Sequence, residues 1–166
     1  MKTPPSLYDF EIKALNSDEM ISLKDFEGKH ILFVNVASKC GFTPQYAQLQ
    51  KLYEQYQDNL VVVGLPCNQF LWQESGGEDK IASFCAMEYG TTFPITTKVK
   101  VKGGGQHPIY RWLTRKAQNG LGDFKVSWNF NKFLVNPEGQ LVEHFGSKVL
   151  PDAKEITKYL ETASAD

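Results

Sequence analysis

Two apolar, β-branched runs limit the folds open to this chain more than any other feature. They cover residues 31–36 and 60–65, and neither alternates with polar residues as a half-exposed strand would. Strands that are buried on both faces of a parallel sheet have this composition. Between the two runs, Tyr46, Leu49 and Leu52 recur at helical spacing. Strand, helix and strand in this order predict a right-handed βαβ unit and an α/β fold.

The rest of the chain adds short elements around this unit. We expect a hairpin over residues 10–15 and 19–23, a helix over 77–89, a short strand over 93–97, helices opening at 107 and 151, and strands over 132–136 and 140–145. The segment Asn136-Pro137-Glu138-Gly139 has proline second and glycine fourth, as in a type I turn. With no linker or repeat, residues 1–166 are interpreted as one domain, with a mixed central sheet, helices on both faces and an N-terminal hairpin.

Composition excludes several classes of function. The net charge of the 166 residues is −1, which provides no electrostatic basis for binding nucleic acid or an anionic membrane. The first five residues lack the charged region and apolar run of a signal peptide, and no apolar stretch reaches membrane-spanning length. Three cysteines are too few for a disulfide framework and favour a reducing compartment. We therefore expect a cytoplasmic protein without a membrane anchor.

Cys40 occupies the joint between a predicted strand and a predicted helix. Thr43 followed by Pro44 is typical of an N-cap with proline in the first helical position. Unpaired amides and the positive end of the helix dipole favour a thiolate just before a helix, and Lys39 adds a positive charge. This arrangement predicts a sulfur nucleophile. The alternative is a cysteine that only packs.

The expected topology assigns a place to that nucleophile. Ligands of open α/β sheets bind beyond the carboxyl ends of the strands, where Cys40 and residues 66–69 both emerge. A thioredoxin-like fold has this organisation, with its nucleophile where the first core strand meets its helix. The order of elements therefore favours that fold.

Three blocks of the chain stand out together. They are residues 35–41, residues 66–70 followed by Gln73-Glu74, and residues 128–130 followed by 132–134. In this order and spacing they resemble the signature blocks of the glutathione peroxidase family, and the similarity spans roughly residues 7–160. The resemblance implies a thioredoxin fold and a peroxidase that reduces hydrogen peroxide and organic or lipid hydroperoxides to water or alcohols. It also implies an antioxidant role under oxidative stress.

The resemblance assigns roles to individual residues. It implies that Cys40 is the peroxidatic residue of a non-selenium, cysteine-type member. It further implies that Gln73, Trp128 and Asn129 complete a catalytic tetrad. These three side chains donate hydrogen bonds and do not lose a proton at neutral pH, so they would stabilise a thiolate by about 1.5–3 kcal/mol each. Taken singly, tryptophan is usually a core residue and asparagine or glutamine a turn or surface residue. Their joint occurrence favours the tetrad.

The two other cysteines receive different interpretations. Cys67 follows the second core strand, and the family often has a cysteine there without catalytic use, so we interpret it as structural. Cys85 lies in a region that resembles the resolving-cysteine segment of thioredoxin-dependent members. The alternative is a buried, inert thiol, because Ile81 and Phe84 share its helical face. A Cys40–Cys85 disulfide would require that helix to unwind.

The chain also departs from the family pattern. It lacks the insertion before Trp128 that tetrameric members use in assembly, and the basic residues that hold glutathione have no clear match. We therefore expect a monomer reduced by thioredoxin, with glutathione as the other candidate reductant. Leu71 and Trp72 make the site rim more apolar than usual, which suits lipid hydroperoxides.

The same residues argue against several rival functions. A dithiol oxidoreductase needs Cys-x-x-Cys, but Thr43 occupies the second cysteine position. A peroxiredoxin needs an arginine near its cysteine, and none lies near Cys40. The cysteines and histidines are scattered without metal-ligand spacing, so neither a metal nor another cofactor is expected. A hydroperoxide sensor that relays oxidation to a partner protein by disulfide exchange remains the alternative function.

Overall fold

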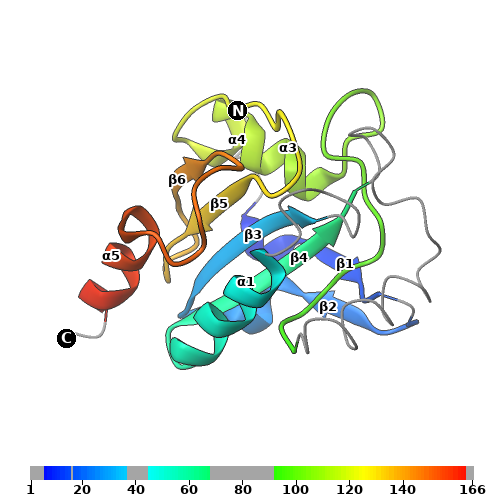
Figure 1. The fold of residues 1–166 in the computed structure, drawn as a ribbon. Coiled ribbons are helices and arrows are strands. Elements are labelled where there is room, and N and C mark those ends of the chain that lie inside the picture. The colour runs from blue at the N-terminus through cyan, green and yellow to red at the C-terminus, as the bar shows by residue number, and fades with distance from the viewer. Residues whose placement is uncertain (1–5, 16, 37–44, 68–91, 164–166) are drawn as a thin grey trace.

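A four-stranded mixed sheet forms the centre of the molecule (Figure 1). The computed structural model describes residues 6–15, 17–36, 45–67 and 92–163. The sheet has the order β4-β3-β5-β6, with bounds β3 (His30–Val36), β4 (Leu60–Pro66), β5 (Lys132–Val135) and β6 (Leu141–Phe145). Strands β3 and β4 are parallel, whereas β5 pairs antiparallel with both β3 and β6. The predicted mixed sheet is confirmed.

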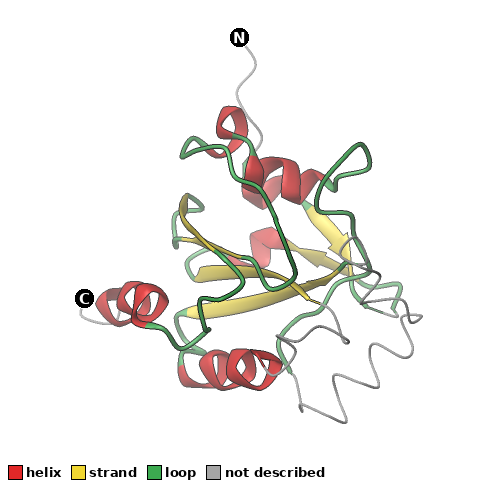
Figure 2. Cartoon of the chain, turned by 45° about the horizontal axis from the view of Figure 1, so that its top comes forward, coloured by secondary structure: helices red, strands yellow, loops and turns green. Residues whose placement is uncertain are grey.

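Helices cover both faces of this sheet (Figure 2). Helices α1 (Gln45–Gln55) and α5 (Lys154–Ala163) lie on one face, and α3 (Pro108–Thr114) lies on the other and is followed by α4 (Lys116–Asn119). On the first face, Leu49 of α1 and Ile156 of α5 are fully buried in one hydrophobic cluster with Leu32 of β3. The alternation of side chains along β3 divides the core in this way.

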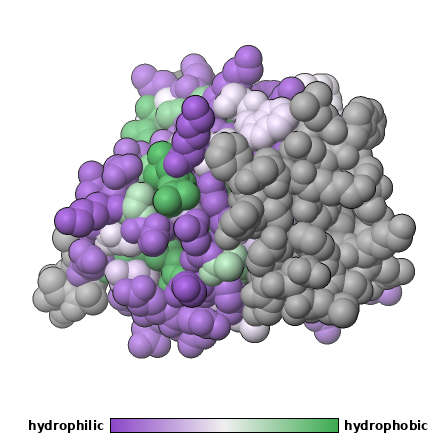
Figure 3. Space-filling model, viewed as in Figure 1, coloured by the Kyte–Doolittle hydropathy of each residue, from purple (hydrophilic) through white to green (hydrophobic). Residues whose placement is uncertain are grey.

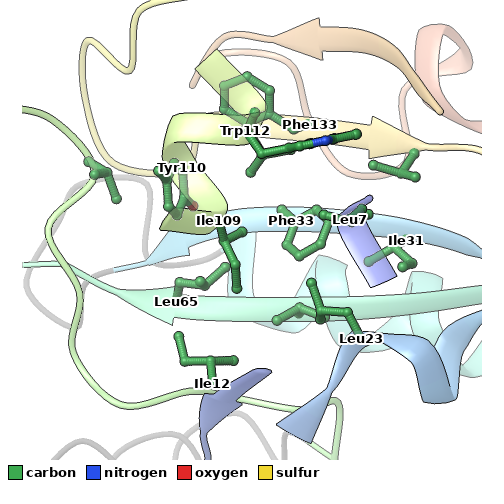
Figure 4. Close-up of a cluster of buried hydrophobic side chains, with 14 of the residues drawn as sticks. Leu7, Ile12, Leu23, Ile31, Phe33, Leu65, Ile109, Tyr110, Trp112 and Phe133 are labelled. Carbon is green, nitrogen blue, oxygen red and sulfur yellow. The ribbon is translucent and has the colours of Figure 1, made fainter. Parts of the chain in front are cut away.

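A second cluster fills the space between α3 and the sheet. Figure 4 shows it around Phe33 of β3, with Ile109 of α3 on one side. Leu7 of η1 (Leu7–Asp9) and Leu23 of η2 (Leu23–Phe26) are fully buried there. Ile12 from the N-terminal hairpin joins them. The N-terminal segment therefore completes the core on this face.

The N-terminal hairpin is present but shorter than predicted. It consists of β1 (Glu11–Lys13) and β2 (Met20–Ser22), with Ile12 paired to Ile21. The structure has no regular strand over residues 93–97, so the predicted short strand is wrong. Isolated bridges join Ala14 to Thr96 and Gly64 to Ile95 instead, because the chain crosses from the hairpin to the edge of β4 within these residues.

Three predicted helix positions have different outcomes. The helix opening at residue 107 is confirmed, since the His107 ring accepts a hydrogen bond from Ile109 N at 3.1 Å and proline occupies N1. It stops at Arg115, whose backbone is extended, and Lys116 begins the separate helix α4. The predicted opening at residue 151 is wrong, because residues 150–153 form a turn and α5 begins at Lys154. The expected helix over 77–89 lies outside the described residues.

Few large apolar side chains are well exposed on the described surface. In the view of Figure 3 it is mostly hydrophilic, with a narrow group of hydrophobic residues. Three large apolar side chains of the described chain are well exposed, namely Met20, Leu121 and Leu150. They lie in three separate parts of the sequence. None of the described helices is long and apolar enough to span a membrane.

Candidate active site

The turn over residues 128–131 lies at one end of the strands of the sheet. Because β5 runs antiparallel to β3, Lys132 at the start of β5 pairs with Val34 near the end of β3. Val36 also pairs with Pro66, so β3 and β4 both end on this side of the sheet. The described strands therefore bring the turn to the place where the chain continues from β3 toward residue 40 and from β4 toward residue 73.

The structure describes two of the four predicted tetrad residues. Trp128 and Asn129 are neighbours in the turn before β5. Cys40, Gln73 and the predicted resolving residue Cys85 lie outside the described residues, as does the predicted cap at residues 43–44.

The two described tetrad residues differ in exposure. Trp128 is half-buried and packs against both hydrophobic clusters. Asn129 is fully buried. A pocket of about 450 Å³ is lined by Ser127, Trp128, Gly146, Ser147 and Lys148. The pocket therefore lies between this turn and the loop after β6.

The backbone of this turn adopts an uncommon conformation. Phe130 has a φ of 60°, and it is the one non-glycine residue of the described chain with a positive φ. Such a left-handed conformation costs about 1–2 kcal/mol for a residue with a Cβ atom. The Phe130 ring is fully buried and packs edge-on against Tyr46, with 5.5 Å between ring centroids. Packing therefore contributes to holding the turn.

Asn35 of β3 binds the turn with its backbone and its side chain. Its carbonyl accepts a hydrogen bond from Phe130 N at 2.6 Å. Its side-chain Nδ2 donates to Trp128 O at 2.9 Å, and its Oδ1 accepts from Asn131 N at 3.0 Å. A fully buried asparagine in an apolar strand requires such partners, because an unpaired amide would be costly.

Side chains bind all three successive carbonyls of residues 128–130. Asn131 Nδ2 donates to Trp128 O at 2.8 Å, adding to the bond from Asn35. Ser147 Oγ accepts from Asn131 Nδ2 at 3.1 Å and donates to the Asn129 carbonyl at 2.5 Å. Lys132 Nζ donates to the Phe130 carbonyl at 2.8 Å. We call these four side chains the carbonyl clamp; they belong to Asn35, Asn131, Lys132 and Ser147.

Two ionisable groups lie within this network. Lys132 is fully buried, and burial lowers the pKa of its ammonium to about 7. The centroid of the His144 ring lies 4.5 Å from that of the Phe133 ring. Burial also lowers the pKa of the His144 imidazole. His144 Nε2 hydrogen-bonds Asn131 Oδ1 at 2.8 Å. Because Asn131 Nδ2 already donates two bonds, its oxygen accepts here, and we assign the imidazole proton to Nε2.

Sequence reasoning missed the carbonyl clamp. Asn35 and Lys132 belong to the blocks that resemble the family signature but receive no role from it, and no sequence pattern points to Asn131 or Ser147. One signal was available, since a polar side chain within an apolar strand must find a partner when it is buried. Among the described residues, no group of three or more histidine, cysteine or acidic side chains is arranged to hold a metal ion.

The fold places this site within a known class. The chain superimposes on the solution structure of a putative thioredoxin from Neisseria meningitidis with a TM-score of 0.64 at 16% identity, covering 98% of this chain and 90% of that one. It superimposes on the crystal structure of Trgpx in its apo form with a TM-score of 0.74 at 34% identity, covering 99% and 98%. The fold is therefore thioredoxin-like, as predicted.

Sequence comparisons define the family within that class. A family model for glutathione peroxidase matches residues 7–114. A glutathione peroxidase of Lactococcus lactis is 44% identical over 158 residues, covering 93% of this chain and 99% of its own. The chain belongs to the glutathione peroxidase family.

Other relatives carry more specific names. The hydroperoxy fatty acid reductase gpx1 of Synechocystis is 45% identical over 164 residues, covering 93% of this chain and 96% of its own. The glutathione peroxidase-like peroxiredoxin 2 of Saccharomyces cerevisiae is 44% identical over 149 residues, covering 89% and 91%. The protein is a glutathione peroxidase-type peroxidase that reduces hydroperoxides.

Proposed function

We propose that this peroxidase is a cysteine-type enzyme in which Cys40 reduces hydrogen peroxide and organic or lipid hydroperoxides. The Cys40 thiolate attacks the terminal peroxide oxygen, so that an S–O bond forms as the O–O bond breaks. The departing oxygen takes up a proton and leaves as water or an alcohol, and the sulfur becomes a sulfenic acid. The observation that carries this proposal is the position of the turn with Trp128 and Asn129. It lies at the end of β3, and β3 ends at Val36, four residues before Cys40 in the sequence.

The donors of the tetrad act on the charge of the sulfur. The Trp128 indole N–H, the Asn129 amide and the Gln73 amide would donate hydrogen bonds to the thiolate. Hydrogen bonds to the charged form lower the pKa of a thiol, so more of it is reactive at neutral pH. Burial of Asn129 strengthens such a bond, because water competes less for the donor.

Lipid hydroperoxides fit the surroundings of the site. The pocket lined by Trp128 and the loop after β6 offers space for a substrate chain next to the turn. Leu71 and Trp72 add apolar side chains to the block that contains Gln73. The Synechocystis relative is named as a hydroperoxy fatty acid reductase, which supports this substrate class.

The oxidised enzyme must then be reduced. We assign this step to Cys85, whose thiol condenses with the Cys40 sulfenic acid to give a disulfide and water. Thioredoxin then reduces the disulfide, with glutathione as the other candidate. The yeast relative is named a peroxiredoxin, which supports reduction of the oxidised enzyme by a thiol protein. We place the enzyme in the cytoplasm as a monomer, with residues 1–166 as one domain.

Peroxide consumption tests the proposal directly. Wild-type protein should consume peroxide catalytically with thioredoxin and reductase, and the same assay with glutathione compares the two reductants. Cys40→Ser should lose all activity while the far-UV circular dichroism spectrum stays unchanged, since a serine hydroxyl is a far weaker nucleophile. Activity of Cys40→Ser within about tenfold of wild type would refute the assignment. Wild-type oxidation that stops after one equivalent would favour the peroxide sensor.

Loss of Cys85 tests the resolving step. Cys85→Ser should keep the first reaction with peroxide, lose turnover with thioredoxin and accumulate over-oxidised Cys40, as measured by intact-protein mass spectrometry. Cys67→Ser is the matched control and should cycle normally, because Cys67 is buried in the core at the end of β4. Full turnover by Cys85→Ser would show that the reductant attacks Cys40 directly.

A further inference from the structure

The turn that carries Trp128 and Asn129 is held by side chains from three separate parts of the chain. We propose that the carbonyl clamp positions these two side chains for the reaction, so that its four members are positioning residues of the peroxidase. The inference rests on the proposed function, in which Trp128 and Asn129 donate to the Cys40 thiolate. It adds a set of residues that act through the backbone of the turn.

The turn does not maintain its conformation by itself. It contains no glycine, although Phe130 must adopt a positive φ of 60°. Without its partners the chain would be expected to rotate at Asn129 and Phe130 toward a conformation without that cost. Such a rotation would redirect both donors, because the directions of the Trp128 and Asn129 side chains follow the backbone. The clamp prevents it by binding the carbonyls of all three residues.

The clamp also ties the donors to the strand that leads to the nucleophile. Asn35 is the penultimate residue of β3, and it makes three hydrogen bonds to the turn. Lys132 belongs to β5, which pairs directly with β3 at Val34. A displacement of about 1 Å in a catalytic group can cost on the order of a hundredfold in rate. Rigid strands that hold both the donors and the start of the segment leading to Cys40 limit such displacements.

Stability alone is a poor explanation for the clamp. Burying an ammonium without a counter-ion is costly, and none of the described carboxylates forms an ion pair with Lys132. The Lys132 Nζ atom nevertheless lies fully buried and donates to the Phe130 carbonyl. A requirement for the exact path of this turn explains the arrangement.

The experiment removes clamp hydrogen bonds and measures the chemistry of Cys40. Ser147→Ala deletes the donor to Asn129 O and the acceptor for Asn131. It should slow the first reaction of reduced protein with hydrogen peroxide about tenfold in stopped-flow measurements, and raise the Cys40 pKa in the pH dependence of iodoacetamide alkylation. Ser147→Thr keeps the hydroxyl and should restore both. Lys132→Met should act in the same direction as Ser147→Ala.

Thr114 provides a matched control in α3. Its Oγ1 accepts from the Gln106 side-chain amide and donates to the Tyr110 carbonyl, so it makes the same pair of bonds as Ser147. Thr114→Val should lower stability and leave the peroxide rate and the Cys40 pKa unchanged. If it slowed the reaction as much as Ser147→Ala does, the effect would be general destabilisation and the inference would be overturned.

The inference and the proposed function fail in different ways. If Asn129→Ala slows the reaction while Ser147→Ala and Lys132→Met react within about twofold of wild type, the clamp is not a positioning device and the proposed tetrad stands. If Asn129→Ala and Trp128→Phe also react like wild type, the donors have no catalytic role. Both the tetrad and the clamp inference would then be wrong.

Discussion

The two turns on either side of β5 keep their shapes by different means. The turn over residues 136–139 is held mainly by its own residues, and distant groups, Gly28 N and the Tyr8 hydroxyl, donate only to its Pro137 carbonyl, at 3.2 Å each. Gly139 N donates to Asn136 O at 2.9 Å, and Asn136 Oδ1 accepts from the backbone of Glu138 and Gln140. Proline at the second position and glycine, with a φ of 82°, at the fourth match the requirements of the turn.

The turn over residues 128–131 depends on distant residues. The Asn35 side chain that binds Trp128 O is 93 positions away in the sequence, and Ser147 is 18 positions from Asn129. A positive φ falls on Phe130 and not on a glycine. The comparison shows that a connecting turn can be specified locally, whereas the turn that bears the candidate donors is specified by the assembled sheet.

The largest expected effect concerns the buried ring of the second turn. Phe130→Ala should lower the free energy of unfolding by about 3–5 kcal/mol in urea titrations, because it removes a fully buried aromatic ring. Glu138→Ala in the first turn is the control and should stay within about 0.5 kcal/mol, since that side chain is exposed. A loss below about 1 kcal/mol for Phe130→Ala would mean that the ring does not anchor its turn.

A pair of asparagine substitutions compares the turns directly. Asn129→Ala should reduce the rate constant with hydrogen peroxide by about ten- to a thousandfold, because it removes a proposed donor to the thiolate. Asn136→Ala should lower stability by about 1 kcal/mol and leave the rate unchanged, because its side chain only caps the local turn. Stopped-flow rates and urea unfolding separate the two results. Equal effects on the rate would abolish the distinction between the turns.

Lys132, which binds the second turn, makes a pH-dependent contribution to the free energy of unfolding. Burial lowers its pKa to about 7 from 10.5. Between these values the unfolded chain holds a proton that the folded chain has lost, so stability rises with pH, by up to about 1.4 kcal/mol per unit. Below about pH 7 both states are protonated, and this group adds no pH dependence.

The Lys132→Met variant isolates that contribution. The difference in unfolding free energy between wild type and variant should move by about 2 kcal/mol in favour of wild type between about pH 7 and pH 9. Other titrating groups cancel in this difference, because both proteins share them. Parallel stability curves over this range would show that the lysine keeps an ordinary pKa.

The smallest effect is expected at the glycine of the first turn. Gly139→Ala should cost about 1–2 kcal/mol for its positive φ, plus the cost of moving the Tyr8 ring, which would lie 2.6 Å from the new Cβ atom. Gly103→Ala has a similar φ of 79° and no atom within 4 Å, so it measures the backbone cost alone. Neither variant should change the peroxide rate. A slower reaction in Gly139→Ala would show that the first turn also influences the site.

Much of the fold could be predicted because its signals are local or periodic. The runs in β3 and β4 and the helical spacing in α1 predicted the parallel unit, and His107 with Pro108 predicted the start of α3. The predictions were weaker where tertiary contacts decide. The end of α3 at Arg115 and the late start of α5 follow from turns that no local pattern marked.

The sequence by itself determined the family, the two core strands, the turn over residues 136–139 and the identity of the proposed donors. These depend on residue order, on hydrophobic period and on side-chain chemistry that acts over a few positions. Only the tertiary structure decided that Asn35, Lys132 and Ser147 converge on the carbonyls of one turn, and that burial lowers the pKa of that lysine. The physical reason is that hydrogen bonds between distant segments, and the loss of water around a charge, arise only once the strands have paired.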